Sequence, residues 1–215
     1  DPEMSRGLGD VYKRQIYDHF INYCVPKGLK AMIVCSSRGA AVEMFDVLRT
    51  MKGANPRVVI TFGDKKEGED DQNTPSAIRK IKEYHEKMVK PLFGDNNEKY
   101  DESVCDNFKN PEGEINILIV KDKLLTGFDA PVAGVLYIDK SMQEHNLLQA
   151  IARVNRVYKD KDFGLIVDYW GVFSKLNKAI DMYNDAESKF NQFDSKDIDC
   201  LLYTSPSPRD ISGSR

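Results

Sequence analysis

The chain has 215 residues, of which 41% are hydrophobic, enough to bury one α/β core and too few for two full-sized domains. Its formal charge of −3 and pI of about 5.7 exclude a global attraction for a polyanion, so any nucleic-acid contact must come from a local site. The sequence has neither an apolar run long enough to span a bilayer nor an N-terminal signal pattern, which predicts a cytoplasmic location and no membrane partner.

The two ends of the chain differ from the rest. Residues 1–15 and 201–215 carry Gly, Ser, Pro and Arg without the apolar period of a helix or a strand. Parts of them, 10–15 and 201–210, resemble translated sequencing-adapter read-through, so we expect two non-native or disordered tails on a truncated gene fragment. A pair of natural disordered tails is the alternative.

Between these ends, short apolar runs alternate with longer stretches of helical period, a pattern typical of βαβ units and a parallel sheet. We predict five strands, at residues 31–35, 58–62, 115–120, 135–138 and 165–169. Five strands suit one doubly wound α/β sheet. We expect a single domain over residues 16–171, followed by a helical extension over 172–200 that leads toward a missing C-terminal domain.

Two helices are expected in the first half of the chain. The first follows the first strand, and its apolar positions fall on one face: Ala41, Met44, Phe45, Leu48 and Met51. The second begins with Thr74 as N-cap and Pro75 as first helical position, and Pro91 ends it. The polar residues 63–73 between them form a surface loop or insertion.

Cysteine and histidine give no support for a metal centre. They are scattered through the sequence without a CxxC pair or a ligand cluster: Cys24, Cys35, Cys105, Cys200, His19, His85 and His145. We therefore expect free thiols, with Cys35 buried, and no metal held by protein ligands.

Three segments that follow predicted strands could carry chemistry, because open α/β sheets bind ligands at the carboxyl ends of their strands. The first contains Thr126, Gly127 and Asp129, where the glycine permits a tight turn and the carboxylate offers an acceptor for sugar hydroxyls. From residue types alone, an ordinary strand-to-helix loop closed by Pro131 is the favoured alternative.

The second segment is a predicted helix opened by a capping box at Ser141 to Glu144. On it, Gln149, Arg153 and Arg156 fall within about 60° of one another. Within residues 145–157, no acidic residue stands four positions away from them, and two unpaired guanidiniums on one edge suit a phosphate ligand. The alternative is the solvated face of an amphipathic helix.

The third segment comprises residues 35–38, where hydroxyls and free backbone N–H groups at a helix N-terminus could hold a phosphate. Ser36 and Ser37 are its candidate residues. Simple helix capping is the favoured alternative.

In this order and spacing the segments resemble the C-terminal motor domain of superfamily-two helicases and translocases, over roughly residues 20–185. The closest resemblance is to the restriction subunit of type I restriction-modification enzymes. Two strings carry it most specifically, Leu-Leu-Thr-Gly-Phe-Asp-Ala-Pro at 124–131 and Leu-Leu-Gln-Ala-Ile-Ala-Arg-Val-Asn-Arg at 147–156. The resemblance implies a RecA-like fold with a mainly parallel sheet and helices on both faces.

The resemblance also implies roles for residues around the nucleotide. Arg153 and Arg156 would be the motif VI arginines that reach the γ-phosphate of ATP held by the preceding domain, and neutralise charge on the transferring group. Gln149 would lie near the nucleotide. Gly127 and Asp129 would belong to motif V, which contacts the ribose.

Contacts with DNA are implied for three further residues. Ser36 and Ser37 stand where motif IV lies, and Thr126 belongs to motif V. They would touch the DNA backbone without reading bases.

By the same resemblance, the full-length protein would be an ATP-dependent type I site-specific deoxyribonuclease that translocates duplex DNA before cleavage, using ATP and Mg²⁺. Its partners would be double-stranded DNA, the preceding RecA-like domain, and the methyltransferase and specificity subunits. We identify no GxxxxGK[ST] sequence, no Asp-Glu box for magnesium and no nuclease domain, so the isolated chain is expected to be inactive.

Two alternatives remain open from the sequence. One is the motor domain of another superfamily-two DNA helicase, since the same parts can drive strand separation or duplex tracking. The other is a non-catalytic DNA-binding or assembly module. A dinucleotide-dependent oxidoreductase is discounted, because no GxGxxG follows any predicted strand.

Overall fold

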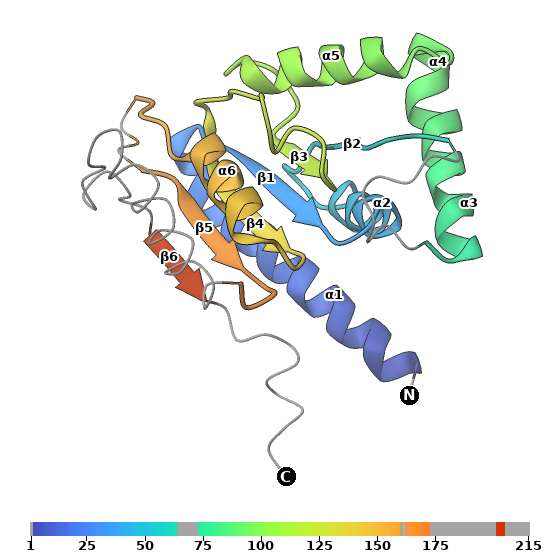
Figure 1. Ribbon diagram of the computed structural model, residues 1–215, viewed down its shortest axis with the longest axis horizontal. Coiled ribbons are helices and arrows are strands. Elements are labelled where there is room, and N and C mark those ends of the chain that lie inside the picture. Colours follow the sequence, from blue (N-terminus) through green and yellow to red (C-terminus); the bar gives the residue numbers. More distant parts are fainter. Residues whose placement is uncertain (1, 64–72, 160, 162, 173–200, 205–215) are drawn as a thin grey trace.

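The computed structural model describes residues 2–63, 73–159, 161, 163–172 and 201–204, with only the backbone described for 2–10, 144 and 201–204. One parallel sheet organises it, in the strand order β2-β3-β1-β4-β5-β6 (Figure 1). The strands are β1 Lys30–Cys35, β2 Pro56–Val59, β3 Ile117–Val120, β4 Ala133–Asp139, β5 Leu165–Asp168 and β6 Leu201–Thr204. All five predicted strands are confirmed, and β1 lies inside the sheet, with β3 and β2 on one side and β4, β5 and β6 on the other.

Helices cover both faces of this sheet, as expected. The α-helices are α1 Pro2–His19, α2 Arg38–Leu48, α3 Pro75–Tyr84, α4 Lys90–Phe93, α5 Asn97–Lys109 and α6 Glu144–Val154. Shorter turns of other types lie at Phe20–Cys24 and His85–Val89 (π) and at Val25–Lys27 (3₁₀). In Figure 1, α6 crosses in front of the sheet, whereas α1 passes behind it.

Strands β1 to β5 are almost entirely buried because both faces of the sheet are covered, which is why their sequences are mostly apolar. Every residue of β1 and β3 is buried. Met32 of β1 stands between Leu118 of β3 and Leu136 of β4 in the parallel register, and all three side chains are fully buried. Burial of one such side chain stabilises the fold by roughly 1.5–3 kcal/mol.

Helix α2 has the predicted apolar face, with Ala41, Met44, Phe45 and Leu48 buried. Its fifth predicted position, Met51, lies beyond the end of the helix and is partly buried. The prediction is therefore confirmed for the apolar face of α2, but it places the C-terminal end of the helix too late.

The start of α3 is also confirmed. Thr74 is its N-cap, with the hydroxyl accepting from the Ala77 N–H, and Pro75 opens the helix. The expectation that Pro91 ends this helix is wrong, because the chain continues through the π turn His85–Val89 into α4. There the Lys90 N–H bonds to the His85 carbonyl, five residues back, and this wider turn accommodates a proline ring that would clash in a regular α-helix.

The chain ends differ from the expected tails without regular structure. Helix α1 occupies residues that lacked an apolar period, and it continues into Ile16 and Phe20, which are fully buried. Strand β6 adds to β5 in parallel. Whether these end segments are natural stays a prediction, and so do the domain boundaries. The helix expected after residue 172 falls on 173–200, outside the described residues.

The three cysteines that the structure describes, Cys24, Cys35 and Cys105, are free and buried, as predicted for Cys35. Cys200 lies outside the described residues. Among the helices that are described, none has the length and apolar character of a membrane span.

Candidate functional site

The loop between β3 and β4 carries the first predicted site segment. Leu125 and Phe128 are each only 5% exposed and anchor the loop in the core, whereas Thr126, Gly127 and Asp129 are exposed. Gly127 has φ +72°, a left-handed conformation that favours glycine, so the predicted tight turn is confirmed. The loop leads directly into β4, so the alternative of a strand-to-helix loop is wrong.

Helix α6 carries the second segment, but it begins later than expected. Its N-cap is Gln143, which makes no side-chain capping bond, and Ser141 lies two residues before it. The predicted capping box is therefore wrong. A box requires the serine itself to be the N-cap, and here the chain enters the helix only after Met142 has been buried.

The C-terminal end of α6 separates the three residues of the predicted stripe. Gln149 and Arg153 lie on the helix, one turn apart, but the helix ends at Val154 and Asn155 leaves it with ψ +64°. Arg156 therefore lies beyond the helix, and the prediction of one continuous helical stripe is wrong at that residue.

Arg153 connects α6 to the loop. Its Nη1 donates to the Phe128 carbonyl at 2.8 Å, and its Nε donates to the Gln149 carbonyl at 3.1 Å. Gln149 itself contacts His145 through Nε2, at 2.7 Å. Two guanidinium nitrogens of Arg153 are thus bonded to the backbone, so this arginine holds the two segments together.

Arg156 faces an acidic side chain from the loop. Its Nε lies 3.5 Å from the Asp129 carboxylate, and the two side chains are 49% and 57% exposed. The expectation that Arg156 has no acidic partner is wrong, because its partner comes from the β3–β4 loop and not from the same helix. An exposed pair of this kind is worth roughly 0–1 kcal/mol, and a ligand could separate it at little cost.

The third segment lies at the start of α2. The Ser37 hydroxyl accepts from the Ala40 N–H at 3.1 Å, and Asn73 Oδ1 accepts from the Gly39 N–H at 2.9 Å. These backbone N–H groups are already bonded, so the expectation that they are free for a phosphate is wrong, and the capping alternative holds for Ser37. Ser36 and Ser37 are both partly exposed.

The predicted residues form two groups, one at the carboxyl ends of the strands and one at their amino ends. Ser36 and Ser37 follow the carboxyl end of β1, whereas the end of the β3–β4 loop lies beside the amino ends of the strands, where the Val132 carbonyl accepts from the Lys30 N–H at 2.9 Å. A six-residue strand spans roughly 20 Å, which is too far for one small ligand. Asp129, Arg153 and Arg156 therefore form one site, and the serines belong to another.

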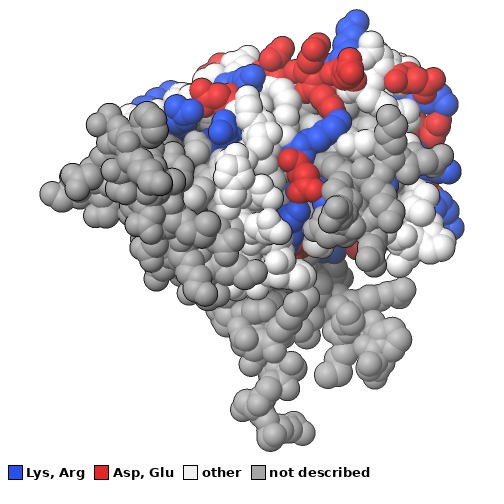
Figure 2. Space-filling view, viewed as in Figure 1, with Lys and Arg blue, Asp and Glu red and all other residues white. Residues whose placement is uncertain are grey.

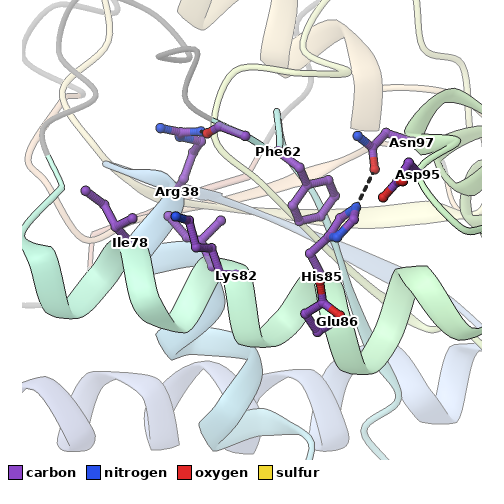
Figure 3. Close-up of a pocket in the computed structure, with 10 residues that line it drawn as sticks. Arg38, Phe62, Ile78, Lys82, His85, Glu86, Asp95 and Asn97 are labelled. Atoms are coloured by element: carbon purple, nitrogen blue, oxygen red, sulfur yellow. Dashed lines mark hydrogen bonds between the residues drawn. The ribbon is translucent and has the colours of Figure 1, made fainter.

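A pocket that the sequence did not predict lies between the end of β2 and α3 (Figure 3), with a volume of about 590 Å³. Both charge signs line it, with Arg38 and Lys82 beside Glu86 and Asp95. Arg38 donates to the Thr61 and Gly63 carbonyls, and His85 bonds Asn97 at 2.8 Å. Arg38 and His85, two polar groups of the pocket, are thus already bonded within the protein, and the lining of the pocket favours no single class of ligand.

Within the described part of the chain, no group of three or more His, Cys, Asp or Glu side chains could hold a metal ion. The sequence has one adjacent Asp-Glu pair, Asp101-Glu102, and it lies inside α5. Asp101 pairs with Lys123 at 2.7 Å. This pair does not follow a strand, unlike a magnesium-binding box.

The sheet order and the two covering helix layers define an α/β domain of the RecA-like kind, the fold of helicase motor domains. A solved fragment of an HsdR subunit of a type I restriction enzyme from Vibrio vulnificus YJ016 shares this fold, with a TM-score of 0.53 and 17% sequence identity. The alignment covers 95% of this chain and 34% of that one.

Residues 27–171 match the family of type I restriction enzyme subunit R, domain 3, and the chain belongs to that family. It is 34% identical over 205 residues to the MjaIXP endonuclease subunit of Methanocaldococcus jannaschii, covering 88% of this chain and 18% of the relative. It is 48% identical over 85 residues to the HindI endonuclease subunit of Haemophilus influenzae, covering 38% of this chain and 8% of the relative. The chain thus spans less than a fifth of either relative, each named as a type I restriction enzyme subunit.

Proposed function

We propose that this chain is the second motor domain of an ATP-dependent duplex DNA translocase in a type I restriction enzyme R subunit. The observation that carries the proposal is the meeting of Asp129 and Arg156 at an exposed site, with the Nε–carboxylate distance of 3.5 Å. These residues come from the two strings that gave the strongest family resemblance. A carboxylate for ribose hydroxyls beside a guanidinium for phosphate suits the two ends of one nucleotide.

The exposed side chains fit ATP presented by a neighbouring domain better than ATP held by this chain alone. Bound with Mg²⁺ on the preceding motor domain, ATP supplies the phosphoryl group whose transfer drives movement. The Arg156 guanidinium is half exposed and can turn from Asp129 toward a phosphate, where its fixed charge offsets developing negative charge. Gln149 and Gly127 flank this site on α6 and the loop.

Arg153 has a different first task. Its bonds to the Phe128 and Gln149 carbonyls hold the Asp129 loop against α6. Pre-positioned groups accelerate a reaction because no reorganisation is needed as charge develops. Arg153 therefore keeps Asp129 and Arg156 in register, and any phosphate contact of its own is additional.

DNA contacts are assigned to the backbone rather than the bases. Ser36 and Ser37 at the carboxyl edge, and Thr126 at the crest of the loop, offer hydroxyls for phosphate oxygens. Figure 2 shows Lys and Arg side chains interspersed with Asp and Glu side chains on the face drawn, and the chain carries a net charge of −3, so such contacts would be few and local. The methyltransferase and specificity subunits supply sequence recognition in this proposal, and cleavage belongs to a nuclease domain elsewhere in the subunit.

The test is ATP hydrolysis by the full-length R subunit with Arg156→Ala, in its restriction complex on duplex DNA. We expect nucleotide affinity within a few-fold of wild type and a loss of turnover of about 10³-fold, the lower end for arginine fingers. The 215-residue chain alone is expected to hydrolyse no ATP.

Arg49→Ala is the matched control. The Arg49 Nε lies 3.3 Å from Asp46, and these side chains are 55% and 45% exposed, so the charge and pairing removed are nearly the same. Arg49 belongs to neither string, and its loss should leave turnover unchanged. Undiminished hydrolysis in Arg156→Ala, or equal losses in both variants, would refute the proposed role.

A further inference from the structure

We propose that Lys161 is a positioning residue of the motor site, whose ammonium group fixes the end of α6 against the end of the β3–β4 loop. The inference rests on the proposed function and deepens it, because it names a group outside both family strings on which the Asp129–Arg156 geometry depends.

The geometry is a tripod of backbone acceptors. Lys161 Nζ donates to the carbonyls of Pro131, Ala133 and Val154 at 2.9, 2.8 and 2.9 Å. An ammonium has three N–H donors, and each finds one carbonyl. The residue is only 7% exposed, and its backbone is fixed by two hydrogen bonds exchanged with Tyr158, at 3.1 and 2.8 Å.

Two of the three acceptors belong to the segments that carry the site, and the third, Ala133, is the first residue of β4. Pro131 comes two residues after Asp129, and Val154 comes between Arg153 and Arg156. The last carbonyls of a helix lack intrahelical partners, and a cation there also suits the helix dipole. One side chain therefore satisfies the end of α6 and ties it to the loop at the same point.

Burying a lysine is energetically costly for a contact that serves the structure alone. Burial lowers the pKa of Lys161 to about 8, which means that the fold holds this ammonium against a desolvation cost. An apolar side chain could fill the same space, but it could not bind three carbonyls. This arrangement is explained if the relative position of the two segments matters more than stability alone.

The chain contains a matched lysine whose ammonium group binds neither α6 nor the β3–β4 loop. Lys30 is 4% exposed, and its Nζ donates to the carbonyls of Asn107, Asn110 and Gly113 at 3.3, 2.7 and 2.9 Å. Burial lowers its pKa as well. These acceptors lie in the last turn of α5 and just after it, and they include none of the candidate site residues, so Lys30 has the same structural role without the positioning role.

The experiment compares Lys161→Met, Lys161→Arg and Lys30→Met in the full-length R subunit, measuring thermal unfolding, nucleotide affinity and ATP turnover. Both methionine variants should lose stability to a similar extent. Lys161→Met should lose about 10²-fold in turnover with KM for ATP within a few-fold, because a misplacement of about 1 Å can cost that much. Lys30→Met should stay within about 2-fold.

Lys161→Arg keeps the charge but offers a planar fork in place of a tripod, so it should fold and show an intermediate loss. If Lys161→Met does not fold, Lys161→Arg carries the comparison with Lys30→Arg. In a double-mutant cycle, Lys161→Met added to Arg156→Ala should cause little further loss, since the lysine acts through the arginine.

Three outcomes would overturn the inference. They are wild-type turnover in both Lys161 variants, equal turnover losses in the Lys161 and Lys30 variants, and fully additive losses in the cycle. If Arg156→Ala loses turnover while the Lys161 variants keep it, only this inference fails. If Arg156→Ala itself keeps turnover, the proposed function fails, and the inference fails with it.

Discussion

Gly164→Ala should displace the end of α6 directly. A Cβ added at Gly164 would lie 2.5 Å from the Val154 carbonyl oxygen and 2.6 Å from the Val154 carbonyl carbon. Both atoms belong to the backbone, so no side chain can rotate away to make room. The Val154 oxygen is also an acceptor of Lys161, and the Gly164 N–H donates to Asn155 Oδ1 at 3.1 Å.

The size of the effect follows from these distances. An ordinary van der Waals contact of a Cβ begins at 3.4 Å, so the backbone at Val154 must move by about 1 Å. Overpacking of this kind costs roughly 1–3 kcal/mol. For a chain of this size, that cost lowers the melting temperature by roughly 2–12 °C. A shift of about 1 Å at the arginines should also lower ATP turnover by up to about 10²-fold.

Thermal and urea unfolding of the 215-residue chain measures the first effect, and hydrolysis by the full-length subunit measures the second. Gly113→Ala is the control, because its Cβ would lie 1.9 Å from the Asn107 carbonyl oxygen, which belongs to α5 and not to α6 or the β3–β4 loop. We expect both variants to lose stability and Gly164→Ala alone to lose turnover. A Gly164→Ala variant with wild-type stability would refute the packing argument, and one with wild-type turnover would refute the link to the site.

Two further predictions concern the same region. Arg153→Ala removes the donor to the Phe128 carbonyl and should destabilise the chain by about 1–3 kcal/mol in urea unfolding, whereas a change under about 0.5 kcal/mol would mean that the loop is held without it. The lowered pKa of Lys161, about 8 against an ordinary 10.5, means that the unfolded chain binds more protons between these pH values. The free energy of unfolding of wild type, relative to Lys161→Met, should therefore rise from pH 8 to 10.5, and a falling difference would contradict a pKa lowered by burial.

The parts of the fold that sequence predicts well are those decided by local pattern. Residues 31–35 of β1 and all of β3 are unbroken apolar runs because both faces of the sheet are buried, and such runs are easily recognised in the sequence. Thr74 and Pro75 mark the start of α3 through bonds made within one turn of the chain. The prediction failed at Pro91, because the sequence rules for helix ends do not include a π turn that accommodates a proline.

The arrangement of the candidate site could not be predicted from the sequence. Residue types, spacing and the family resemblance proposed Asp129, Arg153 and Arg156, and these roles stay predictions. Periodicity assumes that a helix continues, but α6 ends before Arg156. The partner of Arg156 comes from a loop 27 positions earlier, which no helical spacing rule considers. Lys161 gave no signal at all, since a lone lysine near a strand is usually exposed.

The β3–β4 loop has a consequence for how tightly a ligand can be held. The loop side chains of Leu125 and Phe128 are buried. Arg153 and Lys161 donate to the loop carbonyls of Phe128 and Pro131, so the shape of the loop is set when the protein folds. In the proposed function, a nucleotide that binds at Asp129 meets an acceptor whose backbone is already ordered, so little conformational entropy is lost on association. Its release would likewise require no unfolding of the loop, as suits an enzyme proposed to bind and release a nucleotide in every cycle.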